Sequence, residues 1–234
     1  MQTVNPATPL STTQERRLVD YLEEQFLELT RGYKKRSVRA ISSDLSEHDL
    51  TRTDSLHLWK DRSHPSSKLT TLPAYLEAAH HLLNLILQIP PVDPSAALRS
   101  MLLLRLTGEV LNSFPGYTPD EESLSILLDW LQDLDKGWLA VLRSQGWDPV
   151  ARSGISVRLA DGARSGSLSQ TERTRLKSML VAGTEMLEEW VEGLQTQLRE
   201  GEMSDVGTTQ GGRLEDLFSD TLTEMGFLRG EFSV

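Results

Sequence analysis

The segment LSILLDWLQDLDKGWLAVL, residues 124–142, has the clearest periodic pattern in the chain. Its large apolar residues follow one another in alternating steps of three and four, which is the spacing of a heptad seam on one face of an α-helix. Other apolar residues widen that face, so we expect neighbours on more than one side of a central helix. We expect Asp129, Asp133 and Lys136 on the solvent side. The seam consists of Leu124, Leu127, Leu131, Leu134, Trp138 and Val141.

Two more helices are predicted upstream, over residues 73–89 and 95–114, and both end at proline-rich turns. Proline stops a helix but fits the first position of the next one, so Asp93 and Thr118 are expected to cap the helices that follow. Short turns between helices favour antiparallel neighbours. A central core of three helices is therefore predicted over residues 72–147.

Outside this core, amphipathic helices alternate with polar stretches. The capping-box spacing, a hydroxyl residue followed three positions later by Glu, begins a helix at 12–36 and a long helix packing on the core at 169–200. The other predicted segments are a disordered N-terminus at 1–11, a partly disordered connection at 37–71, a flexible linker at 148–168, a linker at 201–212, and a short acidic amphipathic helix with a tail at 213–234.

The resulting fold class is all-α: an antiparallel up-down bundle of about six helices with long flexible connections. Strand-like alternation of useful length is absent, and only residues 155–159 suit an extended conformation. No repeat with the period of a helical solenoid is present. The bundle is therefore favoured over a repeat array.

Composition narrows the function classes. The formal net charge of −10 comes entirely from residues 118–234, which carry 11 basic and 21 acidic residues and should repel nucleic acid and anionic lipid. Cysteine is absent, which excludes disulfides and thiolate metal sites. No run approaches the ~20 apolar residues of a membrane span, and no secretory signal is visible. We expect an intracellular protein, cytoplasmic or nuclear, without a membrane partner.

The sequence contains no recognisable catalytic, cofactor or metal motif. The spacing of Glu77 and His80 occurs in carboxylate-bridged di-iron bundles, but those sites need a second such pair, and none is present. Glu77, His81, Asn84 and Gln88 instead form a narrow polar stripe. An enzyme or a carrier of a ligand or metal that uses the Glu77, His80 and His81 stripe remains an alternative, with bound metal or ligand as its signature.

A basic cluster at the end of the first predicted helix gives a third hypothesis, a nucleic-acid-associated factor or a nuclear localisation signal. The simpler interpretation is that these charges favour the dipole at the helix C-terminus. The acidic second half of the chain makes nucleic acid an unlikely partner. The cluster consists of Lys34, Lys35, Arg36 and Arg39.

Our leading hypothesis is a non-enzymatic helical adaptor or structural subunit of a larger intracellular complex. Tethered amphipathic helices are a common docking device, and both terminal helices fit that description. Each can instead fold back on its own bundle, and a homo-oligomer is also possible. The candidate partner-binding residues are Leu18, Leu22 and Phe26 in the first helix, and Leu214, Leu217, Phe218, Leu222 and Met225 in the last.

Overall fold

The computed structural model describes residues 6–44, 69–200, 214 and 216–226. This part of the chain is mostly helical, which confirms the all-α class, and one two-stranded antiparallel hairpin accompanies the helices. The antiparallel up-down order of the bundle stays a prediction. The elements are α1 (Thr12–Asp44), α2 (Leu72–Leu87), α3 (Ser95–Ser113), the 3-10 turn η2 (Phe114–Gly116), α4 (Glu121–Leu142), β1 (Gly146–Asp148), β2 (Ser153–Ile155), α5 (Gln170–Glu200) and α7 (Ser219–Glu224).

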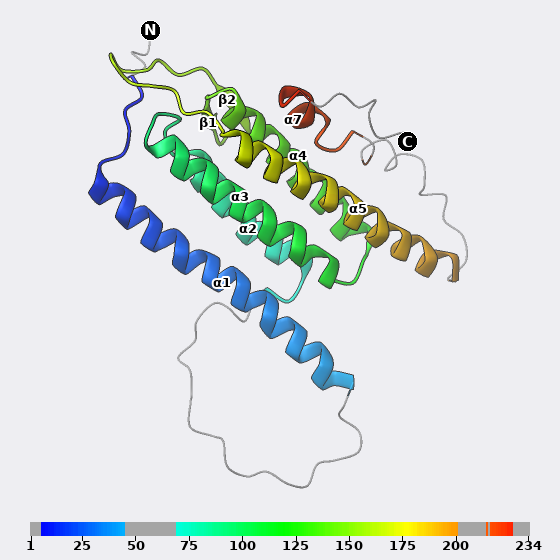
Figure 1. The fold of residues 1–234 in the computed structure, drawn as a ribbon. Helices are drawn as coiled ribbons and strands as arrows, with labels where there is room; N and C mark the ends of the chain where they lie inside the picture. The colour runs from blue at the N-terminus through cyan, green and yellow to red at the C-terminus, as the bar shows by residue number, and fades with distance from the viewer. Residues whose placement is uncertain (1–5, 45–68, 201–213, 215, 227–234) are drawn as a thin grey trace, which may run out of the picture.

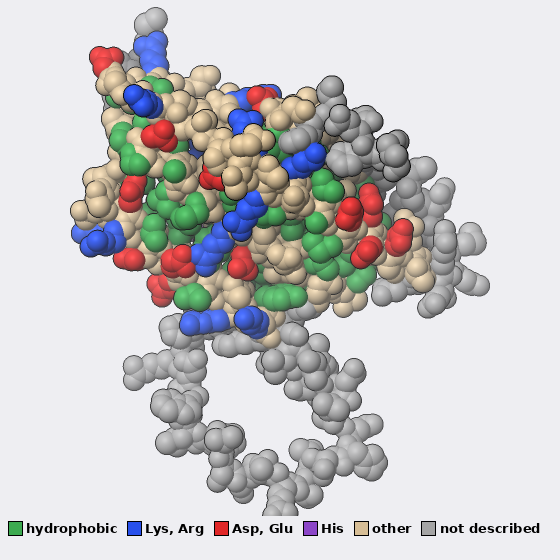
Figure 2. All heavy atoms as spheres, viewed as in Figure 1, with side chains coloured by type: hydrophobic (Ala, Val, Ile, Leu, Met, Phe, Trp, Pro, Cys, Tyr) green, Lys and Arg blue, Asp and Glu red, His purple; other side chains and the backbone are tan. Residues whose placement is uncertain are grey.

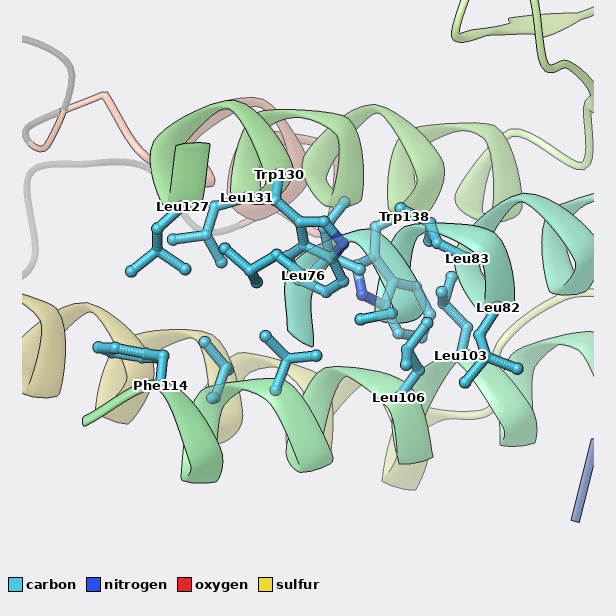
Figure 3. Packing of buried hydrophobic residues seen from close by; sticks show 14 of the residues in the cluster. Leu76, Leu82, Leu83, Leu103, Leu106, Phe114, Leu127, Trp130, Leu131 and Trp138 are labelled. Carbon is cyan, nitrogen blue, oxygen red and sulfur yellow. The ribbon is translucent and has the colours of Figure 1, made fainter. Parts of the chain in front are cut away.

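Helix α2 lies at the centre, in contact with α1, α3 and α4. Helix α5 packs on α3, while α7 and the hairpin both pack on α4. Figure 1 shows α1, α3 and α5 side by side across one face of the molecule. Figure 3 shows leucine and tryptophan side chains of α2, α3 and α4 meeting in the space between these helices.

The predicted seam of α4 is confirmed, since all six of its residues are buried. Leu127 and Leu131 have no exposed surface, and the indole Nε1 of Trp138 donates to Thr107 Oγ1 at 3.1 Å. The predicted solvent side of α4 was wrong for one residue, Asp133. Asp133 is only 5% exposed, because the hairpin covers that flank of α4.

The helix starts at α1 and α5 illustrate how local capping works. At α5 the predicted box is confirmed: Ser169 Oγ accepts from the Glu172 amide at 3.3 Å, and Glu172 accepts from the Ser169 amide at 2.8 Å. At α1 the box lies one residue earlier than predicted and joins Ser11 to Gln14, because glutamine fills the same role as glutamate.

The starts of α3 and α4 differ from the prediction. Helix α3 follows Pro94, which makes no side-chain cap, and Asp93 is not the capping residue. Helix α4 is capped by Asp120 rather than Thr118, with Asp120 Oδ1 accepting from the Ser123 amide at 2.9 Å. Asp120 is the stronger cap because its carboxylate also accepts from the Ser123 hydroxyl, at 2.6 Å.

Several predicted connections are structured. Helix α1 continues to Asp44, eight residues past its predicted end, because residues 37–44 contain no proline or glycine to stop it. Residues 6–10 and the predicted linker at 148–168 pack on the bundle, where the Ala7 amide donates to Arg158 O at 2.7 Å. Residues 1–5, 45–68, 201–213, 215 and 227–234 lie outside the described part of the chain.

None of the helices in the described ranges combines the length and the hydropathy that a membrane-spanning segment needs.

Candidate interaction site at the hairpin

The hairpin of β1 and β2 is a short, well-defined element that directly follows α4. Its register pairs Gly146 with Ile155 and Asp148 with Ser153. Asp148 Oδ1 accepts from the amides of Val150, at 2.8 Å, and Ala151, at 3.1 Å. These bonds satisfy the backbone of the turn locally and fix its shape. The side chain of Asp148 therefore fixes the conformation of the turn at the tip of the hairpin.

Apolar side chains point outward from this element and from the segment that follows it. Val150 at the tip is 93% exposed, Ile155 is 45% exposed and Leu159 is 37% exposed. They are half of the large apolar side chains that are exposed in the described ranges; the others lie on α1 and α3. Exposed arginines interleave with them: Arg152, Arg158 and Arg164. We name residues 150–164 the hairpin face.

Three side-chain hydrogen bonds attach the hairpin to the bundle. At its root, Arg99 Nη1 donates to the carbonyl of Gln145 at 2.6 Å. On β1, the indole Nε1 of Trp147 donates to Asn84 Oδ1 at 3.2 Å. Near the tip, Arg152 Nη1 donates to Asp133 Oδ2 at 2.8 Å. The hairpin is thus attached to α2, α3 and α4 at once.

The root attachment involves a buried charge. Arg99 is 1% exposed, and burial lowers the pKa of its guanidinium to about 10. Its Nε and Nη2 have no hydrogen-bond partner among the described residues. The hydrogen bond that Arg99 makes, from Nη1 to the Gln145 carbonyl, is therefore to a neutral acceptor rather than to a carboxylate.

His80 lies between the other two attachments. Its Nδ1 is 3.3 Å from Asn84 Nδ2, and its Nε2 is 3.3 Å from Asp133 Oδ2. The contact with Asp133 is a close approach of charge rather than a well-directed hydrogen bond. An indole can only donate, so Trp147 fixes Asn84 with its oxygen toward the indole and its NH₂ toward His80. Neutral His80 therefore accepts at Nδ1 and carries its proton on Nε2, beside the carboxylate.

Asp133 is a buried carboxylate that cationic or titratable side chains of α2, α4 and the hairpin approach. Its Oδ2 is shared between His80 of α2 and Arg152 of the hairpin, while Lys136 Nζ of α4 lies 3.6 Å from Oδ1. Arg152 and Lys136 are half-exposed, whereas the Asp133 side chain is 7% exposed. The sequence identified Asp133 as a solvated residue, and the hairpin that buries it was not predicted.

The predicted polar stripe of α2 lines an open groove between α1 and α2. The groove has a volume of about 580 Å³, and Glu28 of α1 faces Glu77 and His81 of α2 across it. His80 and Asn84 also line it, but their polar atoms are engaged with Trp147 and Asp133 as described. Within the described ranges, no group of three or more histidine and carboxylate side chains is arranged to hold a metal ion.

A second open groove, of about 560 Å³, lies between α3 and the start of α5. Figure 2 shows hydrophobic side chains on this face of the molecule, interrupted by charged groups of both signs. Met101 in this groove is 55% exposed, and the walls carry two arginines and two glutamates. The balanced charge gives this groove no preference for a partner of one sign.

The apolar face of α1 packs on the chain's own bundle. Leu22 and Phe26 have no exposed surface, and Leu18 is half-buried against the core. Arg105 of α3 lies over the Phe26 ring, 4.2 Å from its centroid, and pairs with Glu23. The α1 residues predicted to contact a partner are therefore occupied within the chain itself.

The C-terminal helix packs on α4 in the same way. Phe218 is 1% exposed, and the other four predicted contact residues, Leu214, Leu217, Leu222 and Met225, are partly buried against the core. The amide of Thr221 donates to Asp135 Oδ1 at 3.2 Å. Asp135 is only 9% exposed, and burial raises the pKa of its carboxyl above its ordinary value.

The basic cluster lies within α1 rather than at its end. Lys34 is exposed, and the side chains of Lys35, Arg36 and Arg39 fall outside the described part of the structure. The last turn of α1 carries no basic residue, so these charges are not placed to stabilise the helix C-terminus.

Comparison of the chain with protein-family models, with curated proteins and with solved structures finds no match. The class that the fold defines is a helical bundle with a docked β-hairpin, and its function has to be inferred from the geometry of that hairpin.

Proposed function

We propose that this chain is a non-enzymatic helical adaptor or structural subunit of a larger intracellular protein assembly, acting through protein–protein contacts. The observation that supports this proposal is the hairpin face. A valine that is 93% exposed at the tip of a hydrogen-bonded turn buries almost no surface in its own fold. Exposed apolar side chains that cluster on one element are typical of interaction sites.

The hairpin is also well suited to contact a partner at low entropic cost. Three hydrogen bonds to the bundle hold it, so little conformational freedom remains to be lost on binding. The surrounding arginines add a charge preference: residues 150–164 carry Arg152, Arg158 and Arg164 against one acidic residue, Asp161. A partner with an apolar pocket and an acidic rim fits this surface.

The contacts proposed here differ from those that the terminal helices suggested. Leu22, Phe26 and Phe218 are buried in the chain's own core, so their apolar surface is not free. A catalytic role for His80 is less well supported, because Asn84 and Asp133 engage both ring nitrogens. The hairpin face is the surface that best supports an adaptor function.

The test is site-specific photo-crosslinking of the full-length chain in extract of its native source. A photoreactive phenylalanine analogue replaces Val150, and the matched control carries it at Ala182, an exposed position on α5. We expect one discrete adduct at position 150 that is absent at 182 and that excess unlabelled wild-type chain competes away. Equal labelling at both positions, or no adduct at 150, would overturn the proposal.

A further inference from the structure

We propose that His80 is a pH-sensitive latch for the hairpin, and that protonation of its imidazole releases the attachments made by Trp147 and Arg152. This is a regulatory device for the same surface, and only its consequence for partner binding rests on the proposed function. It follows from the positions of five side chains: Trp147, Asn84, His80, Asp133 and Arg152.

With His80 neutral, the donors of Trp147, Asn84 and Arg152 each meet an acceptor. His80 Nε2 lies near the Asp133 carboxylate without a directed hydrogen bond. The indole of Trp147 donates to Asn84 Oδ1 at 3.2 Å, and the Asn84 amide group faces His80 Nδ1 at 3.3 Å. The Nε2–H of His80 lies beside Asp133 Oδ2, which also accepts from Arg152. Both attachments of the hairpin are satisfied in this state.

Protonation breaks the pattern at Nδ1. An imidazolium donates from both nitrogens, so its Nδ1–H faces the NH₂ of Asn84, and two donors oppose each other. Asn84 can relieve the clash by rotating its amide through 180°, which turns its oxygen toward His80. The same rotation turns the NH₂ toward Trp147, whose buried indole N–H then loses its acceptor. The β1 attachment is weakened in either arrangement.

The second attachment is weakened at Asp133. His80 Nε2 and Arg152 Nη1 approach the same oxygen, Oδ2, at 3.3 and 2.8 Å. Once His80 is charged, two cations compete for that oxygen while Lys136 stays near Oδ1. Arg152 is the one that can leave, because its side chain is 52% exposed and water can solvate its charge. The tip of the hairpin is then free of α4.

Other charged groups near His80 supply no acceptor to Nδ1. Glu28 of α1 and Glu77 of α2 line the same groove as His80, and Lys136 and Arg152 lie beside Asp133. His81, next in sequence, is exposed. Asp148 lies in the hairpin itself and is occupied by the amides of the turn.

Histidine side chains ordinarily change their charge between pH 5 and 8, which sets the pH range in which the latch is tested. We expect the hairpin to be docked at pH 7.5 and released at pH 5.5. The hairpin face then no longer has a fixed conformation at acid pH. A partner that binds this face should therefore bind more weakly at pH 5.5 than at pH 7.5.

The experiment is amide hydrogen exchange of the purified full-length chain at pH 7.5 and 5.5, with rates corrected for the intrinsic pH dependence of exchange. We expect protection of residues 146–155 to fall at least tenfold at pH 5.5, while the α2 and α3 amides keep theirs. The NMR signal of the Trp147 indole N–H should shift over the same pH range.

Two variants test the cause. His80→Asn places a non-titrating amide oxygen near the position of Nδ1, so protection should become independent of pH. Asn84→Asp offers a carboxylate that accepts from the indole and the imidazolium together, so the hairpin should stay protected at pH 5.5. Circular dichroism verifies that each variant is folded, and either variant alone suffices for the test.

The latch is overturned if wild type shows no loss of protection at pH 5.5, or if the folded variants lose it to the same extent as wild type. None of these readouts involves a partner. The latch can therefore fail while crosslinking at position 150 succeeds, and crosslinking can fail while the latch holds.

Discussion

The hairpin and helix α7 cover two flanks of the same helix by different physical means. Each contacts an aspartate of α4, and Asp133 and Asp135 are two residues apart, which places them about 200° apart around the helix axis. On one flank, Asp133 is surrounded by Arg152, Lys136 and His80, all of them charged or titratable. On the other, Asp135 accepts from the amide of Thr221 beside buried Phe218.

The two attachments should therefore respond differently to solution conditions. Attachments made by partly exposed charges depend on pH and salt, whereas an attachment made by burying an aromatic ring does not. The Phe218 backbone adopts φ 58°, a left-handed conformation that costs about 1–2 kcal/mol for a residue other than glycine. Burial of the phenyl ring must more than offset that cost for α7 to pack as it does.

The largest expected effect tests the α7 flank. Phe218→Ala removes a fully buried ring and should lower the free energy of unfolding by about 3–5 kcal/mol, measured by urea denaturation. Thr223→Ala, an exposed change in the same helix, is the control and should be nearly neutral. A cost below about 1 kcal/mol for Phe218→Ala would show that α7 is not held by its aromatic residue.

The hairpin flank is tested by a pair of tryptophan substitutions. Trp147→Phe and Trp130→Phe remove the same atoms from two buried side chains, but only Trp147 donates its indole N–H to a partner among the described residues. We expect Trp147→Phe to cost about 1–2 kcal/mol more than Trp130→Phe in urea denaturation, because Asn84 Oδ1 loses its donor. Equal costs would mean that the hydrogen bond contributes nothing to docking.

The sequence predicted the helices better than their surroundings, and α4 shows why. Its heptad seam depends only on the sequence of the segment itself, so the burial of Leu127 and Leu131 could be predicted from the spacing of the apolar residues. The exposure of Asp133 and Asp135 depends on segments far along the chain, which local periodicity does not report. An aspartate on the polar side of a helix has the same local pattern whether water or a hairpin covers it.

The hairpin itself left only a weak signal. Its strands are three residues each, shorter than the runs that period-two alternation can identify. The extended stretch predicted at 155–159 overlaps β2 only at Ile155. The pairing of β2 with β1 was not predicted, because residues 148–168 were expected to form a flexible linker.

A smaller effect separates the two aspartates by the sign of the change in stability when each carboxylate is replaced by an amide. Folding raises the pKa of Asp135, so the folded state binds its proton more readily, and this contribution to stability is present at low pH and lost as pH rises through the raised value. Asp135→Asn keeps an oxygen for Thr221 without a buried charge. At pH 7 it should be neutral or stabilising, within about 1 kcal/mol.

Asp133→Asn is the matched comparison, and it should act in the opposite direction. The amide cannot pair with Arg152 and Lys136, so we expect a loss of about 1 kcal/mol at pH 7. Thermal denaturation of both variants and wild type at pH 7 gives the sign of each change in stability in one experiment. Shifts of the melting temperature in the same direction would refute the distinction between a paired carboxylate and a buried one.

The smallest effect on stability is expected at the tip of the hairpin. Val150 is 93% exposed, so Val150→Asp should change the free energy of unfolding by less than about 0.5 kcal/mol in urea denaturation. The same change should abolish competition by unlabelled chain in the photo-crosslinking experiment, because a carboxylate cannot enter an apolar pocket and repels an acidic rim. Val150→Ile keeps the apolar character and should still compete. If Val150→Asp competes as well as wild type, the tip does not enter the partner, whatever the hairpin contributes to the fold.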